Sequence, residues 1–218
     1  MPQHARTLTL IVLACGAAVI ASCNIGVPVM YALTGPPKIA AQFELDSERP
    51  TVVLIDDPAN KVPRRELRVT IGQVADSELL RSKTVREGKL ISSKSALSAA
   101  TAGASQAGLS IVDVGRRVSA EVVIYAEVTD WRLVSDGEAS ISPAAALSVR
   151  VVDALRNERI FPPEGGQPLV IRLPAESGFK QGDRNVLDRA LAQQVGLELA
   201  RMFFEHDRTQ LQKRRTTP

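Results

Sequence analysis

The stretch "LSIVDVGRRVSAEVVIYAEVTDW", residues 109–131, decides the fold because it joins a helix start to a buried strand. Ser110 can accept a hydrogen bond from the backbone N–H of Asp113, and the Asp113 carboxylate can reach back, as in a capping box. Leu109 and Val114 stand at the two positions of a hydrophobic staple. The stretch therefore predicts a helix of about two turns and then the strand "EVVIYAEV", whose apolar run is typical of a central strand.

Upstream of this stretch, the sequence predicts a strand and a long helix. "PTVVLIDDP", residues 50–58, is a short aliphatic run bounded by prolines and reads as a buried strand that ends in carboxylates. Pro63 is well suited to open a helix, and the apolar spacing after it predicts a helix over 64–83. Residues 89–92 are compatible with a second short strand, whereas 95–107, rich in Ala and Ser, are compatible with either a weak helix or a loop.

Downstream of it, short strands precede a closing helix. In residues 145–154, Leu147, Val149 and Val151 share one face, and Ser148 and Arg150 share the other. Residues 155–162 predict a turn and a return strand, and 168–174 one more strand. Residues 183–206 predict a helix lying across the sheet, against 51–56 and 122–128. Its apolar stripe is Leu187, Leu191, Val195, Leu199, Met202 and Phe203.

This order of elements predicts an α/β fold. Helices separate the early strands, whereas the later strands follow one another directly in the chain. That order favours an open mixed β-sheet with helices packed on it, in a single domain.

The N-terminal residues predict a lipid anchor. Residues 8–22 are apolar or small and follow a single positive charge, Arg6, as in a secretory signal. Ile20-Ala21-Ser22-Cys23 then resembles the bacterial lipobox, and the resemblance implies a diacylglyceryl group on the sulfur of Cys23, which becomes the mature N-terminus. Two alternatives stay open. One is an uncleaved anchor helix over 8–33, which is long enough to span a bilayer, and the other is a plain cleaved signal.

The expected organisation has four parts. They are a lipoprotein signal peptide (1–22), a lipidated N-terminus and tether (23–49), an α/β domain (50–206) and a basic C-terminal tail (207–218). Each reading of the N-terminus leaves the bulk of the chain on the far side of the inner membrane.

Composition excludes several classes of function. Cleavage before Cys23 leaves no other cysteine, so we expect neither a disulfide nor thiol chemistry. It also leaves 26 basic and 24 acidic residues, a near balance that does not fit a nucleic-acid-binding protein.

The sequence also offers no catalytic, cofactor or metal motif, so we expect no enzyme. His206 is the only histidine left after cleavage, and its place near the end of a helix is typical of a partner for the helix dipole. Asp56 and Asp57 end a strand, where side chains can carry chemistry in α/β folds, but a role in capping the turn before Pro58 fits them better. Phosphate-binding glycine motifs and paired zinc ligands are lacking, which excludes the usual nucleotide and zinc sites.

The elements together resemble a group of bacterial envelope lipoproteins. The residues that carry the resemblance are "TVVLID", "AEVVIYAEVTDW", "SVRVVDALRNERIF" and the closing helix, within 50–206. The group includes the curli secretion channel lipoprotein, the lipoprotein activator of penicillin-binding proteins and the N-terminal domain of the Tol-Pal β-propeller protein. The chain departs from the group's pattern at Glu127 and at 156–158, where glycine is common.

The resemblance implies a non-enzymatic adaptor or regulator of an envelope assembly. The protein would face the periplasm, on the outer rather than the inner membrane, with an unidentified envelope protein as partner. Trp131, the only tryptophan, is a candidate contact for that partner, although a half-buried place at a strand end also fits it.

The alternative is a subunit of an oligomeric secretion channel, and the resemblance is compatible with a homo-oligomer. Such a subunit needs paired membrane strands of about 9–11 residues each with alternating polarity, and 131–147 is the region with room for such a hairpin. Asp136, Gly137 and Pro143 argue against a hairpin there.

Overall fold

The computed structural model describes residues 37–103, 109–135, 140–174, 176–177 and 184–207. The chain divides into two compact units, one of residues 1–39 with 206–218, and one of residues 40–205. In the first unit, strand β1 (Lys38–Ile39) pairs antiparallel with β9 (His206–Asp207). Within the described residues, no helix has the length and apolar character that crossing a membrane requires.

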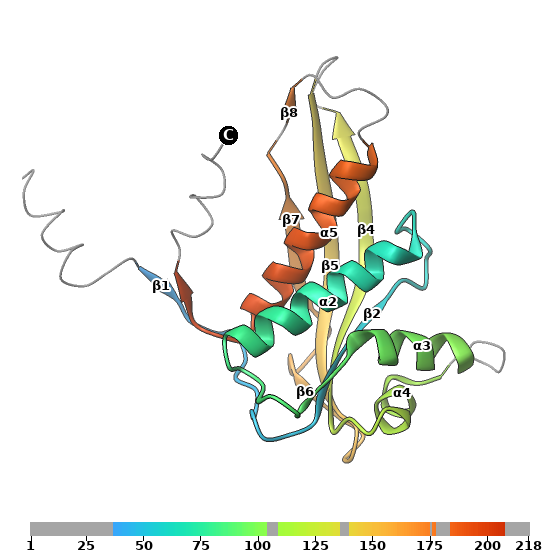
Figure 1. The fold of residues 1–218 in the computed structure, drawn as a ribbon, viewed down its shortest axis with the longest axis vertical. Helices are drawn as coiled ribbons and strands as arrows, with labels where there is room; N and C mark the ends of the chain where they lie inside the picture. Colours follow the sequence, from blue (N-terminus) through green and yellow to red (C-terminus); the bar gives the residue numbers. More distant parts are fainter. Residues whose placement is uncertain (1–36, 104–108, 136–139, 175, 178–183, 208–218) are drawn as a thin grey trace, which may run out of the picture. The chain divides into compact units, whose positions relative to one another are not determined.

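The second unit is built on a mixed β-sheet, which confirms the predicted α/β fold (Figure 1). Strand β2 pairs in parallel with β3 and β4, and β5 pairs antiparallel with β4, β6, β7 and β8. The strands are β2 (Thr51–Asp56), β3 (Leu90–Ile91), β4 (Val122–Ser135), β5 (Ser140–Asp153), β6 (Glu158–Phe161), β7 (Gln167–Arg172) and β8 (Glu176–Ser177).

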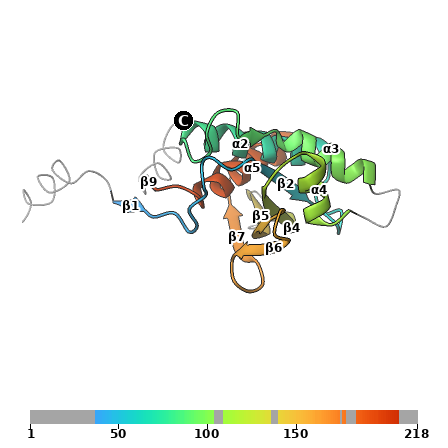
Figure 2. The same cartoon turned by 90° about the horizontal axis from the view of Figure 1, so that it is seen from below.

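Helices pack on both faces of this sheet (Figures 1 and 2). Helices α2 (Arg65–Arg81) and α5 (Arg184–Arg201) cover one face. Helices α3 (Ser93–Gly103) and α4 (Ile111–Arg117) pack on the other, over β2 and the start of β4. The helix left open for 95–107 is therefore formed over its described part, as α3.

The capping box of α4 is confirmed with one change. The backbone N–H of Asp113 donates to Ser110 Oγ over 3.1 Å, and Ser110 Oγ donates to Asp113 Oδ2 over 2.7 Å. The Asp113 carboxylate thus bonds the capping hydroxyl. Leu109 and Val114 both pack in the core on this face, as the staple predicts.

The apolar stripe of α5 is buried as predicted, but its main neighbours differ from the prediction. Its six predicted apolar residues are all buried. The helix packs chiefly on α2, β5 and β7, because α2 already lies over β2. The expected contact with 51–56 is therefore made by α2.

Strands β4 and β5 are 14 residues each and continue their pairing into 131–135 and 141–147, where the sequence argued against a hairpin of membrane strands. Pro143 lies inside β5, opposite Leu133. Its carbonyl accepts from the N–H of Leu173, so its missing N–H also faces away from β4 and removes no bond from the β4–β5 ladder. Asp136 and Gly137 lie outside the described residues.

The compact unit begins ten residues before the predicted domain start, at Ala40. The backbone N–H of Gln42 donates to the carbonyl of Met202 over 2.8 Å, and Phe43 and Leu45 pack against the core. Residues 40–49 therefore belong to the folded unit, although the sequence assigns them to the tether.

Arg49 then ties the start of β2 to two neighbouring strands. Its guanidinium donates to Glu121 Oε2 over 3.1 Å and to Asp153 Oδ2 over 2.8 Å. Asp153 is 1% exposed, and its other oxygen accepts from the backbone N–H groups of Leu155 and Arg156. Burial alone would raise the pKa of Asp153, but the bonds from Arg156 and Arg49 outweigh burial and lower this pKa below its ordinary value.

We expect Asp153→Asn to lower the free energy of unfolding at pH 7 by roughly 1–3 kcal/mol, because Arg49 loses its charged acceptor. A depressed carboxyl pKa stabilises the fold above the unfolded pKa of about 4, and this stability is lost as the pH falls through the folded pKa. The difference in free energy of unfolding between wild type and variant should thus become smaller below pH 4. Urea denaturation at pH 7, 5 and 3 measures it, with Glu87→Gln, an exposed acid, as the control. A difference in free energy of unfolding that does not change with pH would contradict the lowered pKa of Asp153.

Candidate functional site

A β-bulge in β4 decides which side chains face away from α2 and α5. Val128 pairs with Leu147, and Asp130 pairs with the next residue of β5, Ala146, so Thr129 is the extra residue. If the side chains alternated regularly after Val128, the carboxylate of Asp130 would point into the core. The bulge reverses the alternation, so that Trp131 turns toward the helices instead. Lys61 Nζ donates to the carbonyl of Thr129 and stabilises this geometry.

The reversed alternation creates an open sheet face across three strands. The register aligns Asp130 with Ala146 and Val170 in one row, and Arg132 with Ala144 and Arg172 in the next. Val170 is 73% exposed and both arginines are exposed, whereas Asp130 and Ala146 are partly exposed and the small Ala144 is buried between the strands. We call the residues of these two rows the open face; they are Asp130, Arg132, Ala144, Ala146, Val170 and Arg172.

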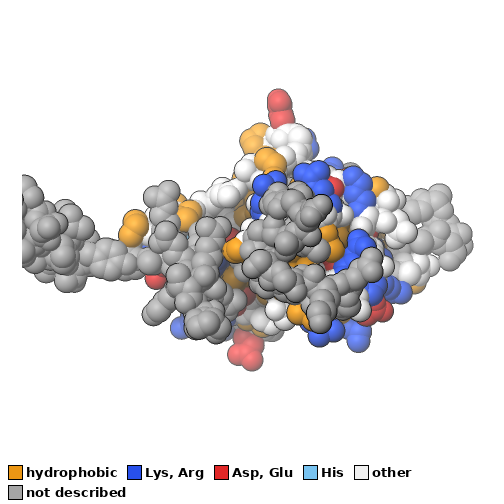
Figure 3. Space-filling view, turned by 90° about the horizontal axis from the view of Figure 1, so that it is seen from above, with side chains coloured by type: hydrophobic (Ala, Val, Ile, Leu, Met, Phe, Trp, Pro, Cys, Tyr) orange, Lys and Arg blue, Asp and Glu red, His pale blue; other side chains and the backbone are white. Residues whose placement is uncertain are grey.

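The chemistry of the open face is that of a recognition surface. Small alanines lie along its middle strand, between charged side chains on β4 and an apolar and a basic side chain on β7. Arg132 Nε lies 3.1 Å from Asp130 Oδ2, whereas Arg172 forms no ion pair with another described residue. Figure 3, which looks along the sheet from the β8 end, shows basic side chains at several places on the visible face, with apolar and acidic ones between them.

Trp131 lies on the helix side of the sheet and is half-buried. Its indole Nε1–H donates to Asp188 Oδ1 of α5 over 3.0 Å, and the ring packs against the core. Asp188 is only 3% exposed, so this bond provides a buried carboxylate with a donor. Trp131 thus holds the hairpin against α5, and its role as a partner contact stays a prediction.

A polar cluster lies beside the open face, at the carboxyl end of β2. Tyr125 Oη donates to Asp56 Oδ2 over 2.7 Å, and Arg150 Nη2 donates to Glu127 Oε2 over 2.7 Å. The guanidinium carbon of Arg150 lies 4.8 Å from the centre of the Tyr125 ring, a cation–π contact. Burial, followed by the bond to Asp56, raises the pKa of Tyr125 well above its ordinary value, so the phenol stays protonated at neutral pH.

Asp57 caps the loop after β2, as its sequence position predicts. Its two carboxylate oxygens accept from the backbone N–H groups of Lys61 and Val62, each over 2.8 Å. Asp56 instead joins Tyr125. Throughout the described part of the chain, no group of three or more His, Cys, Asp or Glu side chains is placed to hold a metal ion.

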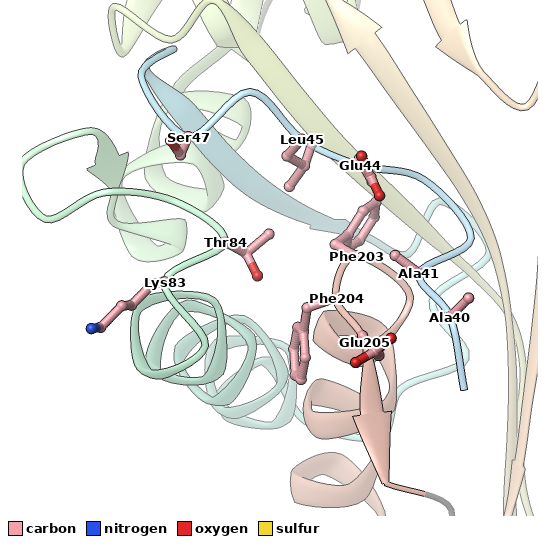
Figure 4. A pocket seen from close by; sticks show the side chains of 10 residues that line it. All are labelled: Ala40, Ala41, Glu44, Leu45, Ser47, Lys83, Thr84, Phe203, Phe204 and Glu205. Carbon is pink, nitrogen blue, oxygen red and sulfur yellow. The ribbon is translucent and has the colours of Figure 1, made fainter. Parts of the chain in front are cut away.

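A pocket of about 310 Å³ lies where residues 40–47 meet the end of α5. Phe203, Phe204, Leu45 and Thr84 surround it, and the ammonium of Lys83 points away from it (Figure 4). Polar and apolar side chains line the pocket together, with the carboxylates of Glu44 and Glu205 and the hydroxyls of Ser47 and Thr84 among them.

Reasoning from the sequence missed the open face, although a signal for it was present. Ile124, Ala126 and Val128 are apolar at even positions, and Trp131 and Leu133 are apolar at odd positions. This change of phase inside one strand indicates a bulge. Cys23, the predicted lipidation site, lies outside the described residues.

Comparisons with known proteins find similar folds only. No family model matches the sequence, and no curated protein matches it. The structure is similar to a PelC dodecamer subunit from Paraburkholderia phytofirmans, with 12% identity over 76% of this chain and 95% of that chain and a TM-score of 0.39. It is also similar to lipoprotein GNA1162 from Neisseria meningitidis, with 13% identity over 67% of this chain and 98% of that chain and a TM-score of 0.41.

A third similar structure is the uncharacterized lipoprotein B from Nitrosomonas europaea, with 11% identity, 73% of this chain and 88% of that chain covered, and a TM-score of 0.34. The neighbours thus include bacterial proteins named as lipoproteins. Identities and TM-scores this low do not assign the chain to a family. The resemblance to the curli, penicillin-binding-protein activator and Tol-Pal group stays a prediction.

Proposed function

We propose that this protein is a lipid-anchored lipoprotein of the bacterial envelope that acts as a non-enzymatic adaptor, or regulator, of an envelope assembly. Cys23 is its attachment point, and it faces the periplasm, on the outer rather than the inner membrane. The open face carries the proposal, because it presents an exposed apolar side chain and two arginines on a rigid three-stranded sheet. The lipobox at 20–23 supports the anchor.

The open face fits a protein partner that offers an apolar side chain next to acidic groups. Val170 is a large apolar side chain exposed at the edge of the face, next to Arg172. Arginine is favoured at protein interfaces because its guanidinium can bind carboxylates in a bidentate way. Asp130 already engages Arg132, which leaves Arg172 as the side chain most suited to an acidic partner.

Site-specific photo-crosslinking in intact cells tests this face. A photoreactive residue at position 170 is compared with one at position 186, because Val186 is also exposed, at 61%, but lies on α5, on the opposite side of the sheet. We expect one discrete crosslinked protein from position 170, lost in an Arg172→Glu background, and none from position 186. Equal crosslinking from both positions would refute the open face as the docking surface.

The alternative function is a subunit of an oligomeric secretion channel. The long β4–β5 hairpin is the observation that favours it, since the hairpin extends past the end of β2. In that case, the crosslinked partner would be a second copy of this chain. Size-exclusion chromatography of the detergent-solubilised protein would then show a large homo-oligomer.

A further inference from the structure

We infer that the envelope partner docks by strand addition, in which an extended segment of that partner pairs with the outer edge of β7. The first observation is the place of β7 in the sheet. It pairs with β5 over Gln167–Arg172, and no other described strand pairs with it. Strand β7 therefore lies at the margin of the sheet (Figure 1). This mode of docking rests on the proposed function, since its occupant is the same partner protein.

The register determines which backbone groups of β7 face outward. The N–H of Leu173 donates to the carbonyl of Pro143 over 2.9 Å, so these two residues form a hydrogen-bonded pair. Hydrogen-bonded and non-hydrogen-bonded pairs alternate along an antiparallel ladder. Counted back along β7, Arg172 and Val170 fall at non-hydrogen-bonded positions opposite β5. Their N–H and C=O groups therefore point away from β5, toward the outer edge.

The outward groups form a short edge that is open to pairing. Val170 and Arg172 each present a donor and an acceptor, and no other described strand pairs with these groups. Pro168, the third outward residue, has no N–H, so it offers a carbonyl only. Proline in an edge strand is one way in which sheets limit pairing with other chains. Pairing is thus restricted to the half of β7 that carries Val170 and Arg172.

The side chains beside this edge define the chemistry of the added segment. Side chains of an added strand alternate between the two faces of the sheet. Those on the open face lie next to Val170, which is 73% exposed, and next to Arg172, which forms no ion pair with another described residue. An apolar residue and an acidic residue two positions apart match these neighbours. The occupant is therefore an extended segment of the partner with this spacing.

A second copy of this chain fits the edge less well. Strand β7, with the sequence QPLVIR, contains no acid, so a second β7 paired edge to edge would leave Arg172 without a carboxylate. Strand β3, at the other margin of the sheet, is only two residues long and contains no acid either. In strand addition, main-chain hydrogen bonds provide affinity and the alternating side chains provide specificity. An acidic segment of another protein satisfies both requirements.

Photo-crosslinking in intact cells from both faces of β7 tests this mode of docking. Position 170 lies on the open face, whereas Leu169 is partly exposed and packs on the helix side of the sheet. A partner that only covers the open face reaches a photoreactive residue at position 170 but not one at position 169. An added strand lies beside both positions. We therefore expect the same crosslinked protein from positions 169 and 170.

Val170→Pro is the decisive variant for the crosslink from position 169, because it removes an outward N–H. Val170→Ala is the matched control, since it also loses the valine side chain but keeps the N–H. The pairing of β7 with β5 should survive, because Pro168 already occupies an outward position in this strand. We expect the crosslink to fall by roughly tenfold in Val170→Pro and to remain in Val170→Ala.

Folding of the proline variant is checked separately. Urea denaturation of a soluble form that starts at Asn24 should give Val170→Pro and Val170→Ala the same unfolding midpoint. If the proline lowers this midpoint, Arg172→Pro compared with Arg172→Ala decides in its place, because Arg172 also points its N–H outward.

Failure of strand addition and failure of the open face give different results. A crosslink from position 170 but none from 169, or one from 169 that survives the proline, would overturn strand addition and leave the open face as the docking surface. A crosslink from 169 that only the proline removes would support strand addition even if positions 170 and 186 crosslink equally. No product from 169 or 170 would overturn both proposals. A product that mass spectrometry identifies as a second copy of this chain would overturn the acidic partner.

Discussion

Leu191→Ala should lower the free energy of unfolding by roughly 2–5 kcal/mol, the range for truncation of a leucine at a packed core site. Leu191 lies in the middle of α5, is 0% exposed and belongs to the core between α5, α2 and the sheet. Because α2 and the sheet surround this side chain on several sides, the cavity left by alanine cannot close without moving both helices. Urea denaturation of a soluble form that starts at Asn24 measures the effect.

Val186→Ala is the matched control, because it lies in the same helix with 61% of its surface exposed. That variant should change stability by no more than about 0.5 kcal/mol. The competing view is that the stripe of α5 docks on another protein. Under that view, Leu191→Ala would leave the unfolding midpoint unchanged and shift only the elution volume in size-exclusion chromatography.

Local patterns in the sequence predicted the helices and strands in which buried residues recur at one regular spacing. The apolar stripe of α5 and the aliphatic run of β2 could be assigned from the sequence, because helical spacing and a continuous apolar run are compatible with few other secondary structures. The capping box at Ser110 could also be predicted from the sequence, since its residues lie within one turn of helix. These signals are local, and the structure confirms them.

Contacts that join distant segments could not be predicted. The sequence gives no sign that α2 covers β2 first and displaces α5 toward β5 and β7. Pro143 argued against a strand because proline has no N–H to donate, and only the pairing shows that its carbonyl and nitrogen face Leu173 rather than β4. The bulge in β4 has a local signal, but the neighbours that complete the open face do not, since Asp130 and Val170 lie in one row on either side of β5.

A glycine in α5 shows the same dependence on a distant partner. Gly196 lies in the interior of the helix, where glycine is normally unfavourable by about 1 kcal/mol relative to alanine. A Cβ at this position would lie 2.4 Å from the carbonyl oxygen of Ile71 and 2.8 Å from Cβ of Val74, both in α2. The two helices therefore cross at a backbone-to-backbone contact that only glycine permits.

Gly196→Ala should consequently destabilise the protein by about 1–3 kcal/mol or more, against the sign that helix propensity predicts. Alanine must push α2 and α5 apart, which loosens the packing of their shared core. Gln193→Ala, at an exposed position of the same helix, should leave stability nearly unchanged. Adding Val74→Ala to Gly196→Ala should recover little, because the closer obstacle is the Ile71 carbonyl and belongs to the backbone. Full recovery in the double variant would place the obstacle in the Val74 side chain, and a stabilised single variant would show that the helices do not cross at Gly196.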